Sequence, residues 1–533
     1  MTKQLLCGAG GPARDSRPHR LWIARHLWMA RQPGASLLAF FARRGLSSLS
    51  TSPLTLPYSS TLLISRAFLC ALCGFSSRPL RFKAFSQRPP RSPRRSLRFK
   101  AFRLPIAIIT LTLCSLPAPA QPKPILLKGG KLLTISHGVI ENGAILIENG
   151  KIVAIGTAVS VKPSKDARIL DISGMTVYPG LIDSETALGL TEISAEETTN
   201  DLIEKSDEIM PHMHVYDAFH AESELIPVTR LNGITNAIVA PENSDTLPGQ
   251  DSFVQLAGPS AAEMLLIRDI AMPLNFTGTQ RRNESWEKRK FPETRMGMAA
   301  QLRQAFLDAQ DYEQHLNDYE KKKADAVRDK KPEPSAPKRD LRLEALLPYL
   351  HGKRPVVLAA ESPSDLETAV RLAQEFNLKF VLNHISHSRS VLDYVAGLKV
   401  PVIVGPIYET PKDDERFDAV YTLPAELYKR GIKIAFASFD AHNSRNLPYQ
   451  AGFAAGFGLP YDEALKAVTL NAAEIWGVAD QYGSLDVGKV ANLVVSNGDP
   501  LDVKTDVKRV FIAGQEIPMT SRQTRLRDQY STK

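Results

Sequence analysis

Short runs of β-branched and apolar residues alternate with helical segments between about residues 179 and 480, and this alternation constrains the fold of the 533-residue chain most. The strand-length runs are Thr235–Ala240, Pro355–Ala359, Lys379–Asn383, Val400–Val404 and Lys433–Ala437. Segments with helical patterning, such as 364–376 and 461–476, fill the gaps between them. Repeated strand–helix units of this length predict an α/β fold with a parallel sheet covered by helices, as in a TIM-type (β/α)8 barrel.

Two β-rich segments flank the region of alternation. Residues 121–178 hold short alternating runs separated by turn signals such as Glu148-Asn149-Gly150, and residues 483–520 hold similar runs. Such runs and turns predict short strands joined by hairpins. The last residues, 521–533, are expected to form a tail.

An insertion at residues 298–337 interrupts the alternation. Apolar residues recur at roughly helical spacing in its first part: Leu302, Phe306, Ala309, Leu316 and Tyr319. This spacing predicts a long amphipathic helix, which continues into a densely charged run and ends in a proline-rich linker. The helix is either a lid or oligomer contact, or an excursion packed on the barrel exterior with a solvated charged end.

The charge of the chain is divided unevenly. The whole sequence has 66 Lys and Arg, 57 Asp and Glu, and a formal net charge of +9. Residues 1–103 alone hold 19 of the basic residues and a single acidic one, Asp15, so the remainder is acidic with a net charge of −9. None of the four cysteines lies beyond Cys114, so no disulfide, zinc finger or cysteine nucleophile is expected downstream.

Residues 104–120 have the parts of a secretory signal. A basic region precedes the apolar run from Leu104 to Leu116, and Ala118-Pro119-Ala120 matches the small-x-small pattern of a cleavage site. The run is too short to span a bilayer, which takes about 20 residues. We therefore expect cleavage after Ala120 and an exported protein, periplasmic or secreted, for which residues 1–103 are a basic, non-structural extension.

The expected partners follow from this division. A basic arm would suit nucleic acid or an anionic membrane surface. That interpretation fails if the arm is absent from the mature protein. We expect a small-molecule substrate, no nucleic acid, and no membrane association after cleavage of the signal.

Two motifs carry a family resemblance. Pro179-Gly-Leu-Ile-Asp183 resembles the entry into the barrel of the amidohydrolase superfamily, specifically its secreted imidazolonepropionase-like branch. Gly483-Ser-Leu-Asp-Val-Gly-Lys489 resembles the family's return into a small β-sandwich. The resemblance covers roughly residues 124–520. It implies a metal-dependent hydrolase with a barrel at 179–482, a β-sandwich from 121–178 and 483–520, and frequent pairing into homodimers.

The resemblance also implies a site at the carboxyl ends of the barrel strands. Family members hold one or two divalent metals there, with a His-x-His pair from strand 1, often a lysine or glutamate from strand 4, histidines from strands 5 and 6, and an aspartate from strand 8. In this chain Glu185 and Ala187 stand at the His-x-His positions, and Ala359 stands at the strand-5 histidine. His384 and Asp440 match the strand-6 and strand-8 ligands, and no strand-4 ligand can be placed.

This depleted set leaves the metal content open. Glu185, His384 and Asp440 would supply three ligands for one divalent ion, zinc or manganese, and zinc sites normally have at least three protein ligands. A set rich in carboxylates would favour a harder ion than a histidine-rich one. We expect at most one ion, with a metal-free mouth as the alternative. In an active enzyme Asp440 would be the catalytic proton shuttle for a metal-activated water.

Four further residues are candidates for substrate binding. His442 and Arg445 follow the strand-8 aspartate directly, and the guanidinium group of Arg445 would suit an anionic substrate group. His387 lies in a second cluster of polar residues, and Gln250 lies in a loop that resembles a family loop following an inner strand. For His387, His442 and Arg445, a purely structural role in a loop is the alternative.

The predicted function is hydrolysis of a carbon–nitrogen bond other than a peptide bond, in a cyclic amide or a dipeptide-like molecule. The alternative is a catalytically inactive barrel that acts as an exported ligand-binding or scaffold protein. Fold alone does not decide between the two, because function depends on the residues of the site.

Overall fold

The computed structural model describes residues 123–277, 291–292, 294–412 and 414–531, which belong to one compact unit of the chain. The basic extension at 1–103 and the signal segment at 104–120 lie outside the described residues. Within the described part of the chain, no helix combines the length and the apolar character needed to cross a lipid bilayer.

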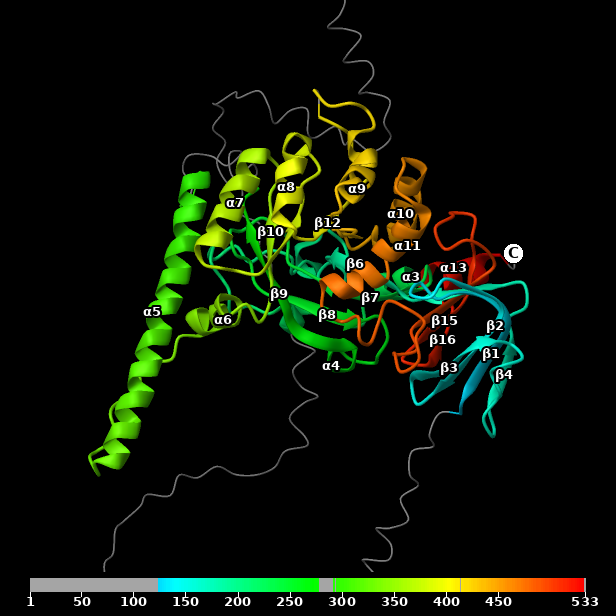
Figure 1. Cartoon of the computed structure of the whole chain (residues 1–533), viewed down its shortest axis with the longest axis horizontal. Coiled ribbons are helices and arrows are strands. Elements are labelled where there is room, and N and C mark those ends of the chain that lie inside the picture. The colour runs from blue at the N-terminus through cyan, green and yellow to red at the C-terminus, as the bar shows by residue number, and fades with distance from the viewer. Residues whose placement is uncertain (1–122, 278–290, 293, 413, 532–533) are drawn as a thin grey trace, which may run out of the picture. The chain divides into compact units, whose positions relative to one another are not determined.

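Eight strands form the sheet that carries the barrel (Figure 1). In sheet order they are β13 (Ile434–Phe436), β12 (Val402–Val404), β11 (Phe380–Asn383), β10 (Val356–Ala359), β9 (Leu265–Asn275), β8 (Asp251–Gln255), β7 (Ile234–Val239) and β6 (Leu181–Thr186). The last and first strands meet at a seam, where the backbone N–H of Phe439 donates to the carbonyl oxygen of Glu185 at 2.9 Å. The sheet is therefore nearly closed, and the expected barrel architecture is confirmed.

One strand departs from the expected parallel order. β8 pairs antiparallel with both β7 and β9, whereas β9 to β13 are parallel to one another. The connections on either side of β8 are short, and the second holds only the four-residue helix α4 (Ala261–Met264). Antiparallel neighbours need only a short connection, whereas parallel strands need a crossover of a dozen or more residues. Strand β8 therefore departs from the parallel arrangement that the sequence led us to expect.

Helices cover the outside of the parallel strands, with α7, α8, α9 and α10 along one side of the barrel in Figure 1. In chain order the covering helices are α3 (Leu225–Arg230), α6 (Leu341–Leu350), α7 (Pro363–Glu375), α8 (Leu392–Leu398), α9 (Ala419–Lys429), α10 (Leu447–Gly456) and α11 (Tyr461–Ala467). The helix α12 (Leu470–Ile475) instead packs in a second cluster with strand residues such as Ile182 and Ile403. Helix α7 shows why the covering helices form. Ser362 caps it by accepting from the N–H of Asp365, and Leu366, Ala369 and Val370 bury one face at helical spacing.

The insertion forms a single 34-residue helix, α5 (Arg295–Arg328). The hydroxyl of Thr294 caps its start by accepting from the N–H of Gly297. Its first half buries a stripe from Met298 to Tyr312, whereas Ala326 is the one described residue beyond Tyr312 that is buried. The second half therefore extends away from the barrel, as Figure 1 shows.

The β-rich segments at the two ends of the described chain meet in a second sheet. Its strands are β1 (Ile125–Leu133), β2 (Val139–Glu148), β3 (Lys151–Thr157), β4 (Arg168–Asp171), β5 (Thr176–Pro179), β14 (Leu493–Ser496), β15 (Val507–Ile512) and β16 (Gln515–Ile517). The two ends join where β14 pairs antiparallel with β5, and the helix α13 (Arg522–Tyr530) follows the last strand.

Gly180 connects this second sheet to the barrel. It joins β5 to β6, and a Cβ atom at this position would lie 2.1 Å from the hydroxyl oxygen of Thr235 on the neighbouring strand. The close approach of the two strands needs a glycine here. The contact fixes where β6 begins, and thus where its carboxyl end delivers Glu185.

Candidate active site

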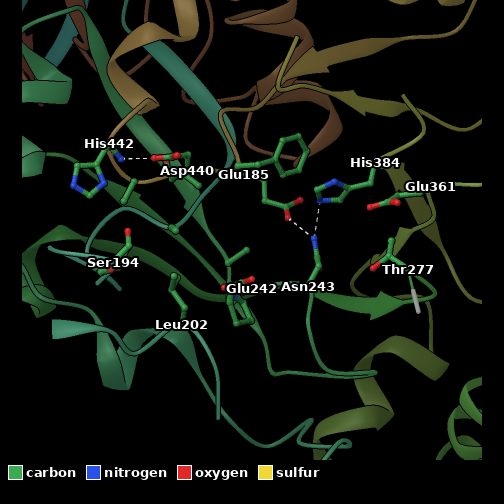
Figure 2. Close-up of a pocket in the computed structure, with 17 residues that line it drawn as sticks. Glu185, Ser194, Leu202, Glu242, Asn243, Thr277, Glu361, His384, Asp440 and His442 are labelled. Carbon is green, nitrogen blue, oxygen red and sulfur yellow. Dashed lines mark hydrogen bonds between the residues drawn. The ribbon is translucent and has the colours of Figure 1, made fainter. Parts of the chain in front are cut away.

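A cavity of about 290 Å³ lies at the carboxyl ends of the barrel strands (Figure 2). Its walls come from the end of β6, the loop after β7, the residue after β11 and the loop after β13. These elements place Glu185, Asn243, His384, Asp440 and His442 around one space. In barrels of this type the carboxyl ends of the strands carry the active site.

Glu185 and His384 are joined by an amide. The side-chain nitrogen of Asn243 lies 2.7 Å from Nε2 of His384 and donates to Oε1 of Glu185 at 3.4 Å. The other carboxylate oxygen of Glu185 accepts from the side-chain amide of Asn383 at 2.7 Å. Because an amide nitrogen only donates, Nε2 of His384 must accept, which assigns the proton of the neutral ring to Nδ1.

Burial makes both of these groups favour their uncharged forms. Glu185 is only 4% exposed, and burial raises the pKa of its carboxyl to about 7, against the lowering effect of hydrogen bonds from Asn383 and Asn243. Burial lowers the pKa of His384 to about 4. Desolvation disfavours the charged form of any ionisable group, so a buried acid holds its proton and a buried imidazole loses it. The imidazole is therefore neutral at pH 7.

Two strained residues hold the mouth of the cavity in shape. His384 and Phe439 have φ angles of 55° and 53°, a left-handed conformation that is uncommon for residues other than glycine. Their rings pack against each other with centroids 4.3 Å apart. His384 directly follows β11, so this conformation turns the chain at the end of the strand.

Asp183 is a functional candidate that sequence reasoning did not single out. It is fully buried on β6, and its carboxylate accepts from the N–H of Ser438 at 2.9 Å and from the hydroxyl of Ser438 at 2.6 Å. The N–H of Glu185 also donates to it, at 3.4 Å. Asp183 therefore ties the first strand to the segment after the last one and orients the backbone that carries Glu185. Its place in the Pro-Gly-Leu-Ile-Asp motif was the available signal.

Asp440 is engaged by its own loop. One carboxylate oxygen accepts from the N–H groups of His442 and Asn443, and the other accepts from the side-chain amide of Asn443 at 3.1 Å. This arrangement is an Asx-type turn that begins the loop. In Figure 2 the carboxylate faces His442 rather than Glu185.

The structure brings Glu185, His384, Asp440 and His442 to the cavity, but it places the other three predicted residues elsewhere. The exposed side chain of Arg445 does not line the cavity, and His387 pairs with Glu415 at 2.9 Å. Gln250 is buried in a structural role, where its amide donates to the carbonyl of Pro211 and accepts from the hydroxyl of Tyr349. The guanidinium group of Arg445 is therefore not placed to bind an anionic group of a substrate in this cavity.

Carboxylates dominate the charge of the cavity instead. Sequence reasoning missed Glu242 and Glu361, which line it together with Glu185 and Asp440. No Lys or Arg is among the described residues that line it. Glu242 and Glu361 each lie two residues beyond a strand-length run, Thr235–Ala240 and Pro355–Ala359, and this position was the available signal.

Comparisons with known proteins agree with this architecture. Residues 364–517 match the model of the amidohydrolase family. The crystal structure of an amidohydrolase from Thermotoga maritima MSB8 superposes with a TM-score of 0.66 at 28% sequence identity, covering 75% of this chain and all of that one. The chain is thus similar to the amidohydrolase family over residues 364–517, and its fold is similar to that of the Thermotoga maritima amidohydrolase. The resemblance to the imidazolonepropionase-like branch is supported only by a short match.

Curated relatives match this chain over limited lengths. The amidohydrolase tasK of Hapsidospora irregularis is 24% identical over 392 residues, which are 70% of this chain and 39% of that protein. Imidazolonepropionase of Bacillus thuringiensis is 48% identical, but over only 50 residues, which are 9% of this chain and 12% of that protein. The chain thus spans well under two thirds of the length of either relative.

Members of the superfamily generally depend on divalent metal ions, and the residues here do not fit such an ion as arranged. Among the residues described, no group of three or more His, Cys, Asp and Glu side chains is placed to hold a metal. The amide of Asn243 takes the accepting nitrogen of His384 and one oxygen of Glu185, and Asp440 is bound within its own loop. The three expected ligands share a cavity without converging on one point.

Proposed function

We propose that this protein hydrolyses an amide-type carbon–nitrogen bond of a small molecule bound in the cavity at the barrel mouth. The observation that carries the proposal is Glu185, a buried carboxyl on the cavity wall whose pKa is raised to about 7. A general acid–base group works best when its pKa lies near the operating pH, because it can then both take and return a proton. The match to the amidohydrolase family model and the similarity to the Thermotoga maritima amidohydrolase support the type of bond.

In the proposed reaction Glu185 handles the proton. Its ionised form takes a proton from a water molecule as the water oxygen bonds to the carbonyl carbon, and the carbonyl oxygen gains the negative charge. The tetrahedral intermediate then collapses, the carbon–nitrogen bond breaks, and protonated Glu185 gives its proton to the leaving nitrogen. Asn243 and Asn383 orient the carboxyl through the two hydrogen bonds described above.

A cyclic amide or a dipeptide-like molecule is the substrate class that we propose. The cavity volume of about 290 Å³ suits a small molecule. The short match to imidazolonepropionase supports a ring-shaped substrate for this chain, although it covers only the 50 residues noted above. The carboxylates that line the cavity disfavour a free anionic group on the substrate, so within this class they favour a neutral cyclic amide over a molecule with a free carboxylate.

The test is a hydrolysis assay of the purified protein against a panel of cyclic amides and acyl dipeptides. We expect Glu185→Gln to lower kcat by roughly 100-fold or more, because general acid–base catalysis contributes about 10²–10⁴-fold. Glu141→Gln, which changes an exposed carboxyl on β2 that pairs with Lys131, is the control and should keep the activity. A Glu185→Gln variant that folds and turns over at the wild-type rate contradicts the proposed role.

A further inference from the structure

We propose that the side-chain amide of Asn243 occupies the space between Glu185 and His384 that a divalent ion would need, so that this pair binds no metal. This inference concerns what the cavity binds, and it holds whether or not the protein hydrolyses the substrates proposed above. The observation behind it is the disagreement between the superfamily's general use of metals and the hydrogen bonds of this site.

The hydrogen bonds around the pair use the atoms that a metal would contact. The amide nitrogen of Asn243 has two protons, one directed at Nε2 of His384 at 2.7 Å and the other at Oε1 of Glu185 at 3.4 Å. The amide of Asn383 serves the second carboxylate oxygen at 2.7 Å. A nitrogen or oxygen atom binds a metal through a lone pair. Here the N–H of Asn243 takes the single lone pair of the accepting imidazole nitrogen, and each oxygen of Glu185 receives one N–H and keeps a second lone pair.

The backbone around the cavity fixes this arrangement. Asn383 is the last residue of β11 and is fully buried, and His384 follows it in a left-handed conformation. The loop that carries Asn243 starts at Ala240, whose N–H donates to the carbonyl oxygen of Thr186 at the end of β6. Asn243 is thus held against the strand of Glu185 on one side and the turn of His384 on the other (Figure 2).

A single substitution tests whether the amide is what keeps a metal out. Asn243→Asp replaces the donor with an acceptor of nearly the same shape. Two carboxylates and an imidazole then face the same space, a set of three ligands that is the usual minimum for a catalytic zinc ion. A cation would also relieve the repulsion between the two carboxylates.

The experiment is calorimetric titration of the purified, EDTA-treated full chain with Mn²⁺ and with Zn²⁺. We expect the wild type to take up no stoichiometric ion, and Asn243→Asp to take up one ion per chain. Asn497→Asp adds the same charge in the second sheet, where the residue already acts as an acceptor toward Asp506, and should behave as the wild type.

Two results overturn the proposal. One is stoichiometric binding of either ion by the wild type. The other is an Asn243→Asp variant that melts like the wild type and still takes up no ion. If that variant fails to fold, nitrogen-15 NMR of the His384 ring in the wild type decides the matter. We expect Nδ1 to carry the proton and Nε2 to keep its shift when Zn²⁺ is added, whereas a shift of Nε2 on addition of Zn²⁺ contradicts the proposal.

Discussion

Asp183 shows how one residue links the stability of the barrel to its site. Its carboxyl is fully buried, and burial raises its pKa to about 7, despite the hydrogen bonds from Ser438 and Glu185 that act to lower it. An aspartate in an unfolded chain has a pKa of about 3.9. The folded protein therefore holds this proton more tightly than the unfolded chain does.

The pH dependence of stability follows from that difference. The stability that comes from protonated Asp183 is fully present below about pH 4, and it is lost as the pH rises toward the folded pKa of about 7. Glu185 acts in the same direction, since burial raises its pKa to about 7 as well. We expect Asp183→Asn to flatten the decline of the unfolding free energy between about pH 4 and pH 7 without abolishing it.

Urea unfolding of the wild type and Asp183→Asn at several pH values measures this effect. Asp506→Asn removes an exposed carboxyl in the second sheet, where the side chain pairs with Lys508, and serves as the control. Equal slopes of unfolding free energy against pH for the wild type and Asp183→Asn would show that Asp183 is ionised in the folded protein.

The residues of the site differ in how far sequence reveals them. Glu185 follows the Pro-Gly-Leu-Ile-Asp motif, and His384 and Asp440 follow strand-length runs. All three stand at positions where the family resemblance expects ligands, so their place at the barrel mouth could be inferred. Asn243 and Asn383 carry the geometry that distinguishes this chain, yet an asparagine in a loop or at a strand end is typical of ordinary turns. Only the distances between side chains show that these asparagines bind Glu185 and His384 rather than merely forming turns.

At the scale of elements, the strands with β-branched, apolar sequences could be predicted and the others could not. Strands β7 and β10 to β13 coincide with runs recognised in the sequence. Strand β8 has the sequence Asp-Ser-Phe-Val-Gln, whose polar residues hide its burial, and the reversed direction of β8 depends on short connections rather than on composition. A local pattern reports burial on one face, and it does not report which neighbour a strand will pair with.

Helix α5 provides a test of where the insertion is anchored. Phe306 is fully buried and packs against Phe376 with ring centroids 5.1 Å apart, whereas the adjacent Leu307 is 46% exposed. We expect Phe306→Ala to lower the free energy of unfolding by about 3–5 kcal/mol, because it removes a large buried side chain and leaves a cavity. Leu307→Ala, the matched control, should change it by less than about 1 kcal/mol.

Thermal or urea unfolding of the two variants gives the comparison. A similar, small effect of both substitutions would mean that the start of α5 is not part of the cooperative fold of the barrel.

At the scale of the whole molecule, both sheets are built from strands between Ile125 and Ile517. Cleavage after Ala120, as the sequence of the signal segment predicts, would leave every one of these strands in the mature chain. It would also remove the basic extension, so that the exported molecule is acidic. Export and the cleavage site are our proposals, supported by the order of basic, apolar and small residues at 104–120.

Expression in a bacterium that exports proteins, followed by N-terminal sequencing of the exported fraction, tests both proposals. We expect the mature chain to begin at Gln121 and to melt at the temperature of the uncleaved chain, because the strands of both sheets survive cleavage intact. Ala118→Arg disrupts the small-x-small pattern and should leave the chain uncleaved. Exported protein that begins before residue 104, or protein that stays in the cytoplasm, contradicts the prediction. An exported protein that begins before residue 104 would keep part or all of the basic extension, and an anionic partner would then be expected.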